Sequence, residues 1–136
     1  MKCELKQGAI APTRAHKNDA GVDLCSPLDV TIYPGDSAVI DTGVCAEIPV
    51  GYCGLLVSKS GLNVKYSITS TGCIDCGYSG SIRVKLYNQG HDIYTVHRGD
   101  KISQLVIIPC MLGDVVIVDE ISEGERGENG FGSTGR

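Results

Sequence analysis

Two segments of the chain place an aspartate beside glycines. Asp23 lies within residues 18–24, and Asp75 lies within residues 72–80. A carboxylate with an apolar neighbour can act as a general base or hold metal-bound water. An aspartate beside glycine more commonly caps a turn. Each segment alone is therefore compatible with either role.

A third segment, residues 58–62, combines a lysine, two serines and a glycine at the end of an expected strand. Its lysine and its serine hydroxyl and amide groups suit a polyphosphate, although ordinary turns have the same composition.

The C-terminal residues 126–136 are unusual for a chain end. Glycines let the backbone approach a ligand closely, hydroxyls and amides can donate to phosphate oxygens, and Arg126 and Arg136 add charge-assisted donors. Phe131, the only phenylalanine of the chain, suits stacking on a nucleobase. The composition is equally that of a solvated tail.

The elements that would position these groups are predicted to be β-strands. Ile82, Val84 and Leu86 alternate with polar residues, which is typical of a half-buried strand. Turn signals separate further strand candidates, so the spacing predicts a barrel or jelly roll. A short helical turn is expected at residues 60–66. The other predicted strands are residues 37–42, 54–58, 93–96, 101–109 and 114–119.

Length and charge limit the possible functions. With 136 residues the chain fits one domain. We expect a β domain over residues 1–121 and a flexible, glycine-rich tail over residues 122–136, which have few apolar side chains. The net charge of -4 disfavours binding to nucleic acid or to an anionic membrane.

Seven scattered cysteines favour reduced thiols over a disulfide framework, and the N-terminal residues lack an apolar signal-peptide core. We therefore expect a cytoplasmic, soluble protein. The Cys73 to Cys76 spacing fits a metal or redox motif, but no second pair or helix pattern accompanies it.

Taken together with residues 98–105, these segments resemble the five ordered motifs of the trimeric dUTP pyrophosphatases. The resemblance extends from Asp19 to Arg136, and its most specific part is the Gly-Phe-Gly-Ser-Thr-Gly run of the fifth motif. The matching stretches are residues 20–24, 58–62, 72–80, 99–104 and 126–135.

The resemblance implies an all-β, distorted jelly-roll (β-clip-like) subunit in a homotrimer, with active sites at the subunit boundaries. It implies hydrolysis of dUTP to dUMP and pyrophosphate, which supplies dUMP and limits uracil in DNA. Asp75 matches the carboxylate that activates the attacking water, and Tyr78 matches the aromatic residue that packs on deoxyribose. The hairpin that includes Gly72 and Ile74 would read uracil.

The remaining matches concern the phosphates and the magnesium ion that the resemblance implies as cofactor. Asp23 matches a carboxylate that reaches the magnesium through water. The predicted phosphate contacts of the folded part are Lys59, Ser60, Gly61 and Gln104. The predicted contacts of the tail, which would close over the nucleotide, are Arg126, Phe131, Gly132, Ser133 and Thr134.

Three residues depart from the family pattern. Lys59 stands where arginine is usual, so a bidentate phosphate contact becomes a point charge. Gly77 stands where a second acidic residue is usual, which leaves Asp75 less crowded by negative charge. Asp19 replaces a small neutral residue, and we have no interpretation of that change.

Other functions remain open at the level of sequence. A dCTP deaminase has a similar fold but is longer and relies on a glutamate in the hairpin region, where this chain has Asp75. A regulatory module that signals bound dUTP to a protein partner would suit a phage relative, although no long inserted loop is present. An inactive relative would normally have lost Asp75 or the tail.

Overall fold

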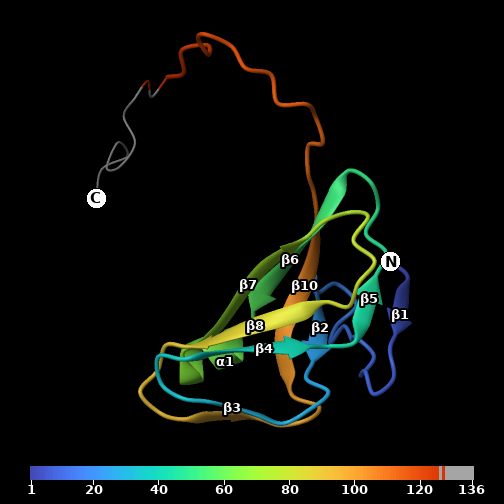
Figure 1. Cartoon of the computed structure of the whole chain (residues 1–136), viewed down its shortest axis with the longest axis vertical. Helices are drawn as coiled ribbons and strands as arrows, with labels where there is room; N and C mark the ends of the chain where they lie inside the picture. The colour runs from blue at the N-terminus through green and yellow to red at the C-terminus, as the bar shows by residue number, and fades with distance from the viewer. Residues whose placement is uncertain (126, 128–136) are drawn as a thin grey trace.

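The computed structural model describes residues 1–125 and residue 127. Over these residues the chain forms one short helix and a series of β-strands (Figure 1). In order, they are β1 (Cys3–Leu5), β2 (Gly21–Cys25), β3 (Val30–Ile32), β4 (Ser37–Asp41), β5 (Val44–Ala46), β6 (Tyr52–Ser58), α1 (Ser60–Tyr66), β7 (Ile68–Ile74), β8 (Arg83–Asn88), β9 (Tyr94–Val96) and β10 (Lys101–Pro109).

Six strands form one antiparallel sheet in the order β2-β10-β6-β7-β8-β4. Two smaller ladders, β1 with β5 and β3 with β9, lie beside it, and the sheet curls around the interior (Figure 1). The fold is therefore the all-β, jelly-roll-like architecture that the sequence predicted.

The core lies inside this curl and is built from aliphatic side chains. Ile82, Val84 and Leu86 are each fully buried, which confirms the period-two prediction. They meet Ile40 on the neighbouring β4 and Leu105 on β10 in one cluster. Burial of each such side chain contributes about 1.5–3 kcal/mol, so the strands stay closely packed without large aromatic residues.

The predicted helical turn is present as α1. It begins after Lys59, whose backbone is extended, and ends at Ser67, which has a left-handed φ of 55°. The N–H of Ser67 donates to the carbonyls of Asn63 and Leu62, which satisfies the last turn. The helix thus fixes the corner between β6 and β7, where the predicted phosphate-binding residues lie.

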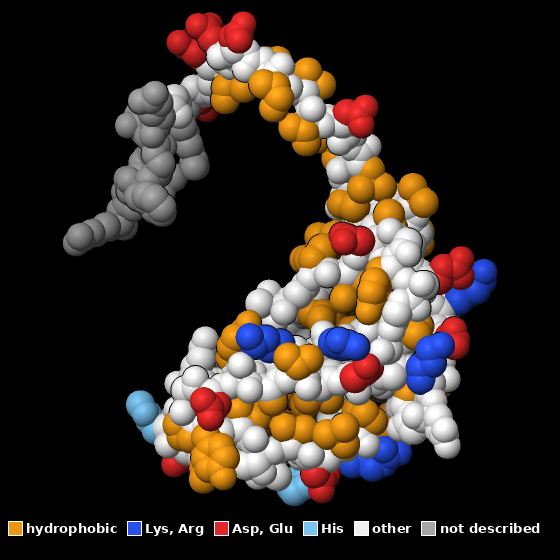
Figure 2. All heavy atoms as spheres, viewed as in Figure 1, with side chains coloured by type: hydrophobic (Ala, Val, Ile, Leu, Met, Phe, Trp, Pro, Cys, Tyr) orange, Lys and Arg blue, Asp and Glu red, His pale blue; other side chains and the backbone are white. Residues whose placement is uncertain are grey.

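The prediction of a strand at residues 114–119 is wrong. Beyond Pro109 the described residues form no regular structure, and the segment leaves the body of the subunit (Figure 1). We call residues 111–121 the arm. Its apolar side chains are exposed, as Val115 and Ile117 show at 88% each, and hydrophobic atoms follow it in Figure 2. A strand needs a hydrogen-bonded neighbour, and within this chain the arm has none among the described residues.

The other five strands predicted by sequence are found at nearly the predicted bounds. His16, His91 and His97 are exposed, as expected. No helix among the described residues is long and apolar enough to cross a membrane.

Candidate active site

A buried carboxylate organises one end of the sheet. Asp23, on β2, is only 2% exposed. Its Oδ1 accepts hydrogen bonds from Lys59 Nζ at 2.7 Å and Gln104 Nε2 at 3.1 Å, and its Oδ2 lies 2.8 Å from Lys101 Nζ. We call these four residues the Asp23 cluster.

Strand register explains why the cluster forms. Gln104 on β10 pairs directly with Asp23 on β2, and β10 pairs on its other side with β6, which ends just before Lys59. Three strands therefore converge on one carboxylate. The structure brings together three residues that the sequence singled out, Asp23, Lys59 and Gln104, and adds Lys101, which it did not.

The cluster is electrostatically positive. Burial by itself raises the pKa of Asp23, but hydrogen bonds from Lys101, Lys59 and Gln104 outweigh this effect and hold the pKa below its usual value. Its hydrogen bond and attraction to Asp23 raise the pKa of Lys101. Two ammonium groups against one carboxylate leave a net charge of +1, which suits an anionic ligand.

A serine network fixes the strand ends beneath the cluster. Ser58 Oγ donates to the carbonyl of Ser70 at 3.0 Å and accepts its N–H at 2.9 Å. Ser70 Oγ lies 2.8 Å from Ser103 Oγ, which in turn bonds the carbonyl of Val57. These buried and partly buried bonds hold β6, β7 and β10 in register. Ser60 and Gly61 follow in the exposed first turn of α1.

The predicted catalytic aspartate lies at the opposite end of β7. Asp75 is exposed and directly follows Ile74, the last residue of the strand. The turn after it contains Gly77, with a left-handed φ of 90°, and Tyr78, whose N–H donates to the carbonyl of Asp75 at 3.2 Å. This turn presents the Asp75 carboxylate to solvent.

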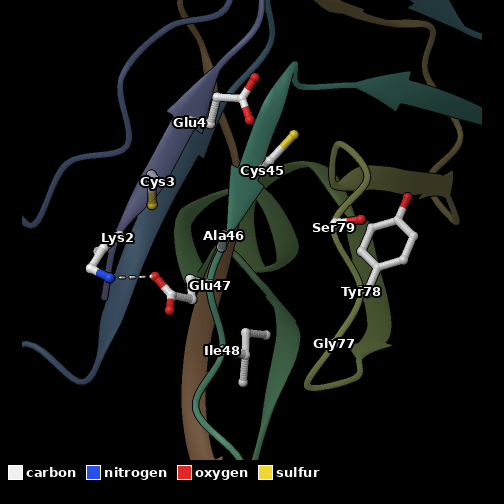
Figure 3. Close-up of a pocket in the computed structure, with 10 residues that line it drawn as sticks. All are labelled: Lys2, Cys3, Glu4, Cys45, Ala46, Glu47, Ile48, Gly77, Tyr78 and Ser79. Carbon is white, nitrogen blue, oxygen red and sulfur yellow. Dashed lines mark ion pairs between the residues drawn. The ribbon is translucent and has the colours of Figure 1, made fainter.

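Tyr78 is held over its own turn and borders a cavity. Its hydroxyl donates to the carbonyl of Ser81 at 3.0 Å. A cavity of about 400 Å³ lies between Tyr78 and the ladder of β1 and β5 (Figure 3). Cys3, Cys45 and Ile48 line the opposite wall. One side of the tyrosine ring thus faces open space that a flat or apolar group can enter.

The hairpin edge beside Asp75 is also open. Strand β7 pairs with β6 from Thr71 to Ile74, but it pairs with β8 only from Ile68 to Ser70. Beyond Ser70, the backbone edge that faces away from β6 has no partner strand in the described part of the chain. Ser70 directs its N–H and C=O toward Ser58 at the end of β6, so by strand alternation the backbone groups of Gly72 and Ile74 also face β6. The N–H and C=O groups on the open edge, which can serve a ligand, are those of Thr71 and Cys73.

One chain does not bring the two sets of residues together. Ser58 lies beside Ser70, whereas Gly54 pairs with Ile74, so four residues of β6 separate the Asp23 cluster from Asp75. At about 3.3 Å per residue this is roughly 13 Å along the strand. Other sequence-predicted site residues, Arg126, Phe131, Gly132, Ser133 and Thr134, lie outside the described residues.

Comparison with known proteins shows which family the chain matches. The dUTPase family model matches residues 7–135. A curated deoxyuridine 5'-triphosphate nucleotidohydrolase of Nocardia farcinica is 44% identical over 96% of this chain and 82% of its own length.

Solved structures agree. The dUTPase of Staphylococcus bacteriophage 80alpha with dUPNHPP superposes with a TM-score of 0.92 at 34% identity, covering 99% of this chain and 98% of that one. A variant dUTPase of S. aureus phage phi11, described with a structural Mg(II) ion, has a TM-score of 0.81 at 33% identity, over 88% of this chain and 96% of that one.

Proposed function

This chain belongs to the dUTPase family and hydrolyses dUTP to dUMP and pyrophosphate, and from that premise we propose how its residues divide the work. Asp75 activates the attacking water, the Asp23 cluster receives the phosphates, and the open edge of β7 reads the base. The observation that carries this assignment is the pair of half-sites at opposite ends of the β6 and β7 ladder.

Asp75 suits the role of general base. Its carboxylate is exposed and forms no ion pair with another described residue, so its oxygens are free to accept a proton from water. The turn that follows fixes its direction through the bond from Tyr78 N–H to its carbonyl. Water held by Asp75 attacks the α-phosphorus, and pyrophosphate leaves.

The Asp23 cluster and the first turn of α1 suit the phosphates. Lys59 supplies a point charge, Gln104 supplies an amide donor, and Ser60 and Gly61 supply a hydroxyl and exposed backbone N–H groups. Because lysine cannot form the two parallel bonds of arginine, we expect weaker phosphate binding than in relatives with arginine, with the chemical step preserved.

The nucleoside would lie against β7. The unpaired backbone edge around Gly72 and Ile74, where Thr71 and Cys73 present their N–H and C=O groups, offers donors and acceptors to the edge of uracil. Tyr78 packs against the deoxyribose, where a ribose hydroxyl would clash. From the tail, Phe131 covers uracil and Arg126 approaches the terminal phosphate, while Gly132, Ser133 and Thr134 add donors; these five assignments rest on the sequence motif.

Magnesium fits the phosphate side of the site. In proteins this ion is held mainly by substrate phosphates and water, with few protein ligands. Asp23 is the buried carboxylate that would accept hydrogen bonds from its water once Lys59 and Gln104 turn to the phosphates. An ion held there would supply positive charge against the phosphates and help to hold them in line with the attacking water.

We propose a homotrimer in which different subunits supply the two half-sites. The separation along β6 requires a second chain to bring Asp75 near an Asp23 cluster. The exposed apolar side chains of the arm also require a partner surface, since Val115, Ile117 and Ile121 are each more than four-fifths exposed. We place the enzyme in the cytoplasm, where its seven free thiols stay reduced.

The primary test is pyrophosphate release from dUTP with magnesium, beside dCTP, dTTP and UTP, and repeated with EDTA. Metal-dependent release from dUTP alone supports the assignment. Binding of dUTP without cleavage would contradict it.

A second test addresses the shared site. Asp75→Asn and Lys59→Met chains, each inactive or impaired alone, are mixed under conditions that exchange subunits. If a site takes these residues from different chains, roughly a quarter of the mixed sites contain neither substitution, and activity returns. A mixture no more active than its components would contradict the division between subunits.

A regulatory role is a second candidate. The phage 80alpha structure is described in terms of control of virulence gene transfer by a G protein-like mechanism, and its fold covers nearly all of this chain. A protein partner would then recognise the nucleotide-bound state. Pull-down with and without a non-hydrolysable dUTP analogue tests this role, and recovery of no nucleotide-dependent partner would exclude it.

A further inference from the structure

The two oxygens of Asp23 are used unequally. Oδ1 accepts from both Lys59 at 2.7 Å and Gln104 at 3.1 Å, and Lys101 lies 2.8 Å from Oδ2. Lys59 and Gln104 are the two members proposed to contact the phosphates. Lys101 is the member to which neither the sequence nor the proposed function gives a role.

Binding of the substrate phosphates would leave the buried negative charge of Asp23 without two of its partners. If Lys59 and Gln104 turn from Asp23 to the phosphates, a carboxylate that is only 2% exposed loses both partners of Oδ1. A buried charge without a partner is strongly unfavourable, so this exchange is feasible only if another cation stays with Asp23. Lys101 is the described residue that meets this condition.

A β-bulge places Lys101 there. Gln104 pairs with Asp23 and Ser103 with Leu24, but the register shifts before Lys101, which pairs with Cys25. In a regular strand, positions 101 and 104 would face opposite sides of the sheet. The extra residue turns Lys101 to the face of Gln104 and Asp23, and leaves Ile102 and Ser103 both buried in succession. The irregularity in β10 thus lies at the point where it directs the Lys101 side chain toward Asp23.

We propose that Lys101 is a positioning residue that keeps Asp23 neutralised while Lys59 and Gln104 transfer to the phosphates of dUTP. This inference rests on the proposed function. The cluster holds a spare positive charge because Lys101 and Lys59 face one carboxylate, and Lys59 is the cation released to the substrate. Loss of Lys101 ties Lys59 to Asp23 and weakens phosphate binding without removing the group that activates water.

The test compares three substitutions of Lys101 in the full chain. Lys101→Met removes charge and donor, Lys101→Gln keeps a donor without charge, and Lys101→Arg keeps the charge. Lys85→Met on β8 is the matched control, because β6 and β7 separate that strand from β10 and the change in net charge is the same. The side chain of Lys101 is 44% exposed, so all three variants should fold, which thermal melting verifies.

The readouts are kcat and KM for pyrophosphate release from dUTP, and inhibition by inorganic tripolyphosphate. We expect KM and the inhibition constant to rise about tenfold in the Met and Gln variants while kcat stays within about twofold, the signature of lost ground-state binding. Lys101→Arg and Lys85→Met should match the wild type.

Two results would overturn the inference. One is an unchanged KM in Lys101→Met, and the other is a loss of kcat shared by all three variants with KM unaltered, which indicates a purely structural role. A wild-type chain that does not release pyrophosphate would instead overturn the proposed function itself.

Discussion

Replacing Asp75 by asparagine separates catalysis from folding. The side chain is exposed after the end of β7 and forms no ion pair with another described residue. The structural contact at this position is made by the backbone, since its carbonyl accepts the N–H of Tyr78. Asparagine preserves that contact and the volume of the side chain.

The magnitudes follow from these contacts. Because no described partner is lost, the free energy of unfolding should change by less than about 0.5 kcal/mol. Turnover should fall by about 10² to 10⁴, the usual loss when a general base is removed, which raises the activation barrier by about 3–5 kcal/mol. The assays are urea denaturation, single-turnover pyrophosphate release and binding of a non-hydrolysable dUTP analogue.

The matched control is Asp92→Asn, which makes the same charge change at an exposed position in the loop before β9. It should leave turnover unchanged. Turnover of Asp75→Asn within about threefold of wild type would refute the assignment of Asp75 as the base. A large loss of stability would show that the carboxylate supports the fold through contacts outside the described residues.

Three further outcomes are expected. Deleting residues 127–136 should sharply reduce turnover and leave the melting temperature nearly unchanged; a large drop in melting temperature would mean that this segment stabilises the fold. Gly54→Ala should cost about 1–3 kcal/mol in urea denaturation, since a Cβ would lie 2.7 Å from Leu105 and 2.8 Å from Ile48; no loss would show that these side chains move aside freely. The lowered pKa of Asp23 means that its stabilisation is present above its ordinary pKa of 3.8 and is lost as pH falls further. Unfolding curves between pH 7 and pH 2 should therefore be flatter at the acid end for Asp23→Asn, and parallel curves would contradict this.

The sequence predicted β4, β6, β8, β9 and β10, where apolar residues alternate with polar ones or run between turn signals. Strand β10 has the predicted bounds, and α1 has the predicted seven residues. Strands β2 and β7 and the three-residue strands β1, β3 and β5 were not predicted. Four of the five residues of β2 are buried, so it shows no alternation, and β7 is rich in serine, threonine and glycine. In β1, β3 and β5, three residues are too few to define a period.

The error at residues 114–119 has a different cause. These residues alternate little and are mostly apolar, which is typical of a strand, but the chain provides no neighbour for them among the described residues. An apolar composition indicates that a segment is buried, but it does not show whether the surface that buries it belongs to the same chain or to another. In a single subunit, an apolar segment whose partner surface lies on another chain is exposed, as the arm is.

The site was predicted in parts. Asp23, Lys59 and Gln104 came from separate motifs, and the ladder from β2 through β10 to β6 brings them together. Lys101 was missed because its direction depends on the bulge. The sequence does contain a signal for it: Ile102 and Leu105 are three residues apart in a strand where apolar residues should be two apart.

The length of β6 keeps Asp75 and the Asp23 cluster of one chain apart, so we expect catalysis to depend on the assembly of subunits. Asp75 cannot move toward its own Asp23 cluster without breaking the ladder from Gly54 to Val57, which lies in the best-connected part of the sheet. Phosphate binding and water activation are thus fixed to opposite ends of a rigid element. In the homotrimer we propose, the rigidity that separates them within one subunit becomes an advantage, because each end is presented in a fixed geometry to a neighbour.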